Sequence, residues 1–284
     1  MKKLILLFLV CVAAFVSGVI LGPDAAVTAK EIKAISAFDR MEKSGVMRCG
    51  YMVWPPLIQK DPNTGDFSGV FYDMAQEMAK ALNYKLDMAH EFGLATYQED
   101  MARGVFDVEC TGGWANAARG KKALYTKPLA YFSIIAVVSP KYADVSDLDW
   151  INHPNIHMAI MDGETSSLIR QERFSKSSEL SLPHTASSVD LLMQVATGKA
   201  DVTFVDQASA VRFDRANPGQ IRLLTDMPVR VIPLTFGTAP GEERLIAVLN
   251  AAIDQLMFDG IVDRILDTYD PEASAFRRVQ KPYQ

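Results

Sequence analysis

The chain has 284 residues, of which 49% are hydrophobic and 22% are charged, a composition typical of globular proteins. Its formal net charge is −5 at pH 7, so the sequence offers no basic stripe to neutralise the phosphates of a nucleic acid. The length allows one large domain or two modest ones.

The N-terminus has the pattern of a targeting segment. Lys2 and Lys3 precede an apolar run over residues 4–21, and a small-residue stretch follows at 25–29. This order is typical of an export signal, although the run is also long enough to span a membrane. Residues 1–29 are therefore predicted to be a signal peptide or an N-terminal anchor.

The first half of the chain is predicted to alternate between helices and strands. The expected elements are a helix at 30–44, a strand at 46–52, a helix at 70–83, a strand at 84–89, a helix at 96–103 and a strand at 106–110. Apolar residues at helical spacing, such as Met74 and Met78, indicate the helices. The alternation predicts an α/β unit with a mainly parallel sheet, which binds ligands beyond the carboxyl ends of its strands.

A second α/β cycle follows a long apolar strand predicted at 131–139. The expected elements are a strand at 157–161, a helix opening at 162–167, a helix at 188–197, a strand at 201–205, an extended run at 230–238 and helices at 242–256 and 261–269. The last two helices have no sheet of their own and are expected to return to the first domain.

The predicted organisation is an α/β fold of two lobes, with two mainly parallel sheets flanked by helices. Lobe 1 is assigned to residues 30–133 and 234–270, lobe 2 to residues 134–233, and a C-terminal tail to residues 271–284. The chain then crosses between the lobes twice, and two crossings make a hinge.

Two charged residues suit the head group of an amino acid. Arg119 lies beyond the strand predicted at 106–110, and Asp206 directly follows the strand predicted at 201–205. An arginine binds a carboxylate through two parallel hydrogen bonds, and an aspartate accepts from an ammonium. If the two residues meet across a cleft, they match an α-amino acid. The alternative is that each makes an unrelated surface ion pair.

Several segments together resemble the family 3 extracellular solute-binding proteins, which include the polar-amino-acid receptors of ABC importers. The resemblance covers roughly residues 38–271 and is carried by residues 38–50, the loop Trp54-Pro55-Pro56-Leu57, the spacing from Asp107 to Arg119, the helix start Asp162-Gly163-Glu164-Thr165 and the strand ending at Asp206. In that family these segments form the opening helix and strand, an aromatic loop that stacks on the ligand, two carboxylate-binding segments and an ammonium-binding strand.

The resemblance implies a type II periplasmic-binding-protein fold. It implies a periplasmic receptor that captures a small amino acid or related carboxylate between its lobes and delivers it to a membrane ABC permease. A monomer is expected, with no cofactor, no metal and no enzymatic activity. The implied ligand-binding residues are Arg119, Asp206, Thr165, Trp54, Thr111, Gly112 and Trp114.

Several positions depart from the family pattern. Trp114 and Asn116 stand where Ser or Thr is usual, and a tryptophan there would reshape the pocket. Met52 and Val53 end the first predicted strand, where receptors for basic amino acids can carry an acid, and this argues against a lysine or arginine ligand. Glu109 is an acid within a strand, and either a polar seam or a ligand role would account for it.

Other functional classes are less well supported by the sequence. The 4 histidines show no metal-ligand spacing that a helix could use. The resemblance also includes periplasmic dehydratases of cyclohexadienyl substrates, for which Glu109 or Glu164 is a candidate general acid. A sensor or accessory protein that presents its closed cleft to a partner is a third interpretation.

Cys49 and Cys110 both lie in predicted strands. Export permits a disulfide, and the two strands are expected to be neighbours in the first sheet. The sequence is equally consistent with two buried free thiols.

Overall fold

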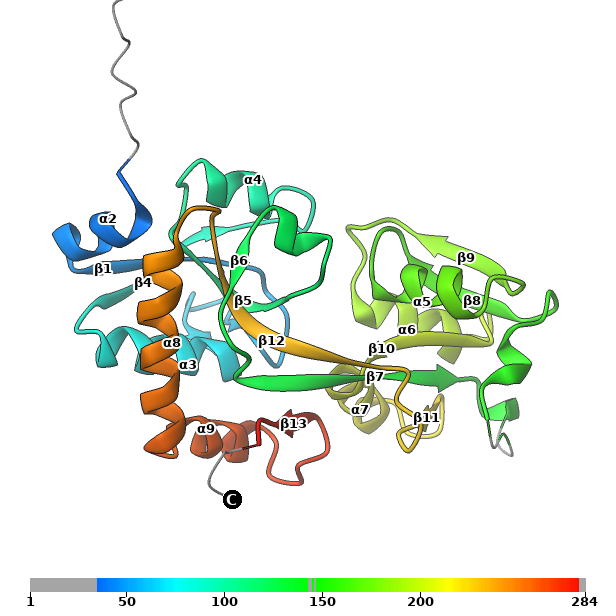
Figure 1. The fold of residues 1–284 in the computed structure, drawn as a ribbon. Coiled ribbons are helices and arrows are strands. Elements are labelled where there is room, and N and C mark those ends of the chain that lie inside the picture. The colour runs from blue at the N-terminus through cyan, green and yellow to red at the C-terminus, as the bar shows by residue number, and fades with distance from the viewer. Residues whose placement is uncertain (1–34, 143–144, 146, 281–284) are drawn as a thin grey trace, which may run out of the picture. The chain divides into compact units, whose positions relative to one another are not determined.

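The computed structural model describes residues 35–142, 145 and 147–280. The predicted targeting segment at residues 1–29 lies outside the described residues. Most of the predicted helices and strands are present within one or two residues of the expected bounds, and Figure 1 shows their arrangement.

The first part of the sheet is parallel, as predicted. Strand β1 (Val46–Tyr51) pairs with β4 (Lys85–Glu91) on one side and with β5 (Val108–Trp114) on the other. The accompanying helices are α2 (Ala37–Ser44), α3 (Val70–Ala81) and α4 (Tyr97–Ala102). Helix α3 packs on the sheet because Met74 and Met78, one turn apart, are both fully buried.

The second part of the sheet contains β8 (His157–Met161), β9 (Ser178–Leu182) and β10 (Val202–Asp206), all mutually parallel. Helices α5 (Thr165–Arg173), α6 (Ser188–Ala196) and α7 (Gln207–Ala216) accompany these strands. Strand β9 and helix α7 were not predicted from the sequence. Strand β9 alternates half-buried and exposed residues at the sheet edge and lacks an apolar run.

Two long strands join these parts of the sheet. Strands β7 (Ala130–Val138) and β12 (Arg230–Thr238) pair antiparallel, with Leu234 opposite Ala130. The end of β12 continues onto β5, and the end of β7 continues onto β10. The predicted crossings thus coincide with paired strands, and the expected two sheets are parts of one 11-stranded sheet. Eight of its strands follow the order β4-β1-β5-β12-β7-β10-β8-β9, and three short strands pair beside this path with β7 or β12.

The C-terminal helices α8 (Glu243–Phe258) and α9 (Ile261–Tyr269) pack against α3, as expected (Figure 1). Within the predicted tail, β13 (Phe276–Arg278) pairs with β7. Four further short strands are β2 (Gln59–Lys60), β3 (Phe67–Ser68), β6 (Leu124–Tyr125) and β11 (Arg222–Leu224). No single described helix has the length and apolar character to cross a membrane. Among the described helices, one bent pair, α8 and α9 with an angle of 73° between them, meets that test of length and composition.

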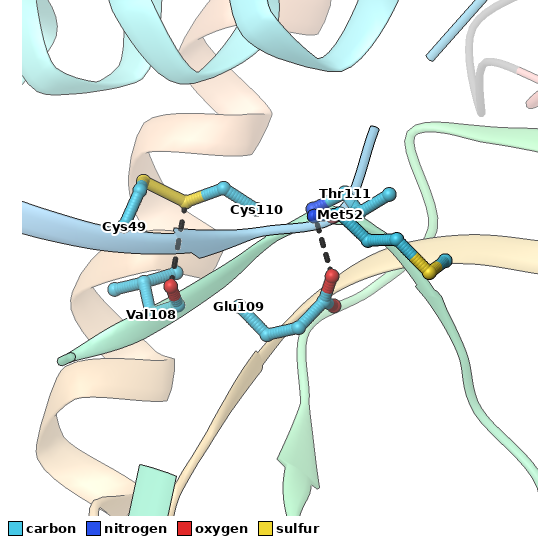
Figure 2. The surroundings of a disulfide bond; sticks show 6 residues. All are labelled: Cys49, Met52, Val108, Glu109, Cys110 and Thr111. Carbon is cyan, nitrogen blue, oxygen red and sulfur yellow. Dashed lines mark hydrogen bonds between the residues drawn. A yellow bond between two sulfur atoms is a disulfide. The ribbon is translucent and has the colours of Figure 1, made fainter. Parts of the chain in front are cut away.

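A disulfide joins Cys49 on β1 to Cys110 on β5, which is one of the two alternatives that the sequence left open. The two Cα atoms are 5.6 Å apart, within the range that a disulfide spans. Figure 2 shows the bridge on one face of these strands and Glu109 on the other face. Residues 109 and 110 point in opposite directions because side chains alternate along a strand.

Candidate functional site

Three adjoining hollows lie at the C-terminal ends of β1, β5 and β10 and at the N-terminal end of α5. The first cavity is lined by residues that include Glu109, Thr111, Gly112 and Arg119. The second cavity is lined by residues that include Thr165 and Asp206. Trp54, Trp114 and Glu164 line both cavities. An outer groove continues from Met52, Trp54 and Leu94 to Ser188 and Arg212.

The two tryptophans lie against each other at the junction of the cavities. Their rings are edge to face, with centroids 5.6 Å apart, an arrangement that aromatic pairs favour. Trp54 is held by its own loop, because its backbone exchanges hydrogen bonds of 2.9 and 3.1 Å with Ile58. Both rings line the first and the second cavity, and their contact with a ligand stays a prediction.

Arg119 begins a short 3₁₀ helix after β5 and reaches into the first cavity. Its Nη2 atom lies 3.5 Å from Oε1 of Glu164, and its guanidinium lies 5.9 Å from the centre of the Trp114 ring. The Arg119 amide donates to Asn116, and its carbonyl accepts from Gln98, so the backbone is anchored on both sides. The guanidinium is therefore presented to the cavity by a fixed loop.

The carboxylate that pairs with Arg119 in this structure belongs to Glu164. It is the N-cap residue of α5, but its side chain makes no capping hydrogen bond. Burial raises the pKa of Glu164, and the charge of Arg119 acts in the opposite direction. This ion pair was not predicted from the sequence, although an acid directly before the helix start at Thr165 was a visible signal.

Thr111 and Gly112 form the edge of the first cavity near the end of β5. The Thr111 hydroxyl accepts from the amide of Met52 at 2.8 Å, which ties the end of β1 to β5. Gly112 has a φ of 93°, and a Cβ there would lie 3.1 Å from the ring of Phe71. Only glycine adopts this conformation readily.

Asp206 ends β10 and caps α7. Its Oδ1 accepts from the Ser209 amide at 2.8 Å, while Oδ2 is buried and makes no hydrogen bond within the described residues. Burial raises the pKa of Asp206, and the Ser209 amide acts in the opposite direction. A buried acceptor without a partner is costly, so Oδ2 is a ready acceptor for a donor that enters the second cavity.

Glu109 is buried, and its carboxylate contributes to the wall of the first cavity. Its Oε1 accepts from the Thr111 amide at 2.7 Å (Figure 2), and its Oε2 has no hydrogen-bond partner in the described part of the chain. A Cβ on Gly113 would lie 2.3 Å from Oε2, so this glycine leaves room for the acid. Burial raises the pKa of Glu109 to about 7, although the amides of Thr111 and Gly113 and the charge of Arg119 lower it.

All seven residues implied by the sequence line one or both cavities. Arg119 and Asp206 do not line the same cavity; they line two cavities that share Trp54, Trp114 and Glu164.

The chain matches the family model for bacterial extracellular solute-binding proteins, family 3, over residues 47–272. It belongs to this family. Most members of the family are binding proteins without enzymatic activity.

Solved structures with the same fold include amino acid-binding proteins. An ancestral amino acid-binding protein, described as a precursor of cyclohexadienyl dehydratase, superposes with a TM-score of 0.72 at 23% identity, covering 82% of this chain and 99% of that one. The binding component of an ABC transporter from Wolinella succinogenes, solved with lysine, gives a TM-score of 0.71 at 21% identity, covering 79% and 95%. These similarities establish the two-lobed α/β fold of this solute-binding protein.

Curated relatives of the binding protein include enzymes. Membrane-bound lytic murein transglycosylase F of Cronobacter sakazakii is 24% identical over 240 residues, which are 84% of this chain and 45% of the enzyme. Cyclohexadienyl dehydratase of Pseudomonas aeruginosa is 25% identical over 184 residues, 64% of this chain and 67% of the enzyme. The chain thus spans less than half of the transglycosylase.

Proposed function

We propose that the protein binds a small amino acid, or a closely related carboxylate, between its two lobes. The observation that carries the proposal is Arg119, whose guanidinium already lies 3.5 Å from a carboxylate inside a cavity. Asp206 supports the amine half of the ligand, because its buried Oδ2 lines the adjoining cavity and makes no hydrogen bond to a described residue. Trp54 and Trp114 supply the apolar wall between them.

Delivery to an ABC permease completes the proposed role. The protein is exported through residues 1–29 and acts as a monomer in the periplasm. Lobe 1 comprises residues 30–133 and 234–270, lobe 2 comprises residues 134–233, and the tail is 271–284. The lobes close around the ligand by movement at β7 and β12, which pair with each other between the two parts of the sheet.

A thermal-shift screen against the amino acids and small carboxylates tests the proposal. A ligand at 100 times its Kd stabilises the native state by about 2.7 kcal/mol, which such a screen detects readily. Stabilisation by at least one amino acid, with calorimetric binding at one site, is the expected result. A screen in which no amino acid or carboxylate stabilises the protein would reject the proposed function.

Replacing Asp206 by asparagine is expected to weaken an amino acid far more than its deaminated analogue. Asparagine can still cap α7, but the charge-assisted hydrogen bond to the ammonium is lost, at a cost of about 1.5–3 kcal/mol. Calorimetry should therefore show a loss of roughly 10- to 150-fold for the amino acid and little change for the matching acid without the amine. An equal loss for both ligands would remove the ammonium from the proposed binding mode.

Ligand binding is expected to change tryptophan fluorescence through Trp54 and Trp114. Trp150 serves as the internal control, because it stacks on Tyr142 with centroids 4.3 Å apart and lines none of the three hollows. The wild-type emission should respond strongly to ligand, and that of the Trp54→Phe/Trp114→Phe variant hardly at all. A full response in the double variant would place both rings away from the ligand.

Catalysis is the second candidate, favoured by the similarity to cyclohexadienyl dehydratase and by the protonatable Glu164 in the cavities. We propose binding without turnover. Incubation of the purified protein with a cyclohexadienyl substrate should leave it unchanged beyond the uncatalysed rate. Turnover that disappears in Glu164→Gln would replace the receptor proposal with an enzymatic one.

A further inference from the structure

Around the three hollows, acidic side chains outnumber arginine side chains. Within the described residues, Arg119 and Arg212 face three carboxyl groups, those of Glu109, Glu164 and Asp206. Glu109 and Asp206 are each only 2% exposed. Buried carboxylates are stable only when they are paired, hydrogen-bonded or protonated. With all three carboxyl groups ionised, the empty site carries one negative charge more than its two arginines balance, and this charge is removed either by protonation or by a cation.

Two of these carboxyl groups each have an oxygen that no described residue satisfies. These atoms are Oε2 of Glu109 and Oδ2 of Asp206. Native proteins leave few buried polar atoms without a partner, so each oxygen is suited to a donor that a ligand brings into the site. In the proposed function Asp206 receives the α-ammonium of the ligand, which leaves Glu109 without a role.

The first cavity around Glu109 also has the aromatic walls that suit a cation. Trp54, Phe92, Tyr97 and Trp114 all line it. The faces of such rings attract ammonium and guanidinium groups, and the guanidinium of Arg119 already lies 5.9 Å from the Trp114 ring centre. An aromatic wall with a buried acid favours an organic cation over a neutral polar group.

A metal ion is a poorer explanation for the surplus of acids. No group of three or more His, Cys, Asp or Glu side chains in the described chain is placed to hold a metal.

From the charge balance, the free acceptor atom and the aromatic walls, we infer that the ligand is a basic amino acid. Its side-chain ammonium or guanidinium enters the first cavity beside Glu109 and Glu164. This inference rests on the proposed function and names the class of ligand within it.

The acid that recognises the cation comes from β5 and not from the end of β1. The end of β1 carries Met52 and Val53, and their lack of charge argued against a basic ligand. However, the Met52 amide donates to Thr111 at 2.8 Å, two residues beyond Glu109 on β5. Glu109 thus supplies a carboxylate to the same cavity that Met52 lines.

Protonation of Glu109 gives the inference a second consequence. Arg119, Tyr97 and Tyr125 interact electrostatically with this carboxyl group, and burial raises its pKa to about 7. Near neutral pH the Glu109 carboxyl group is therefore protonated in a fraction of the ligand-free molecules. A bound cation lowers the pKa of Glu109 and releases this proton, so affinity should rise as pH increases through about 7 and fall below it.

Calorimetry with matched ligands tests the inference on the wild-type protein. L-Ornithine and L-norleucine have the same shape and differ in the side-chain ammonium, and L-arginine and L-citrulline form a second such pair. At pH 8 the basic member should bind at least tenfold more tightly in at least one pair. Equal or tighter binding of both neutral members would overturn the inference, while the proposed function would stand if Arg119→Lys still weakened them.

Variants locate the preference at the named acids. Glu109→Gln and Glu164→Gln should each reduce the ratio of ornithine to norleucine affinity by roughly tenfold or more. Glu243→Gln, an exposed change on α8 that lines none of the hollows, should leave it unchanged. An unchanged ratio in both of the first two variants would overturn the inference.

Proton release gives a readout that does not depend on the variants folding. Titrations at pH 7 in two buffers with different ionisation enthalpies should show proton release when wild type binds ornithine, and much less with norleucine. Equal release for both ligands would contradict the role of Glu109. Cadaverine, a diamine without a carboxylate, separates the two proposals. Binding of cadaverine that Arg119→Lys leaves unchanged, together with failure of all amino acids, would overturn both the amino acid function and the basic amino acid as ligand, and would leave only a site for an organic cation.

Discussion

Replacing Arg119 by alanine is expected to weaken the tightest amino acid of the screen by about 2–5 kcal/mol, or roughly 30- to 5000-fold. The ligand carboxylate loses the two parallel N–H donors of the guanidinium. Glu164, which Arg119 contacts in this structure, is left without its cation. Calorimetry gives the loss directly. The urea midpoint of the free protein shows separately whether the fold has weakened.

Matched variants divide this effect into charge and geometry. Arg119→Lys keeps the charge but cannot donate two parallel hydrogen bonds, so it should retain only part of the affinity. Lys121→Ala removes an exposed cation from the same 3₁₀ helix and should have little effect. Unchanged affinity in both Arg119 variants would show that the carboxylate binds elsewhere.

Removing the disulfide is expected to cost roughly 4 kcal/mol of the free energy of unfolding. The bridge joins residues 61 positions apart, and it restricts the unfolded chain more than a short loop would. The Cys49→Ala/Cys110→Ala variant should therefore unfold at a clearly lower urea concentration than wild type.

Reduced wild type is the control that separates the crosslink from the change of side chains. If the crosslink is the cause, wild-type protein in excess reductant should unfold near the midpoint of the double variant. Identical midpoints for oxidised and reduced wild type would contradict the prediction.

The sequence predicted most of the longer helices and strands but not the way the sheet is joined. Apolar spacing located α3 and α9, and short apolar runs located β8 and β12. Sequence periodicity cannot identify which strands become neighbours, so β7 and β12 were predicted as crossings without their mutual pairing. Strand β9 and helix α7 were missed because neither has a strong apolar pattern of its own.

The seven residues that the sequence proposed for the site all line the two cavities, and their role in ligand binding stays a prediction. The contacts between them could not be predicted from the sequence. Arg119 and Asp206 were identifiable because each follows a strand at a spacing that resembles the family. The ion pair of Arg119 with Glu164 joins residues on separate elements, far apart in sequence, and only the folded chain brings them together. The position of Glu109 in the first cavity likewise depends on the space beside Gly113 and Gly237.

The pairing of β7 with β12 determines the kind of motion that the proposed hinge permits. Their backbones are hydrogen-bonded from Arg230 to Leu234, so neither strand can slide without breaking several bonds of the other. Two-stranded ribbons are more strongly twisted than larger sheets, and a change in twist or bend leaves these hydrogen bonds in place. The connection is therefore expected to bend elastically as one paired ribbon. The ends of β5 and β10 can then approach or separate while each residue of β7 and β12 keeps its hydrogen-bonding partner.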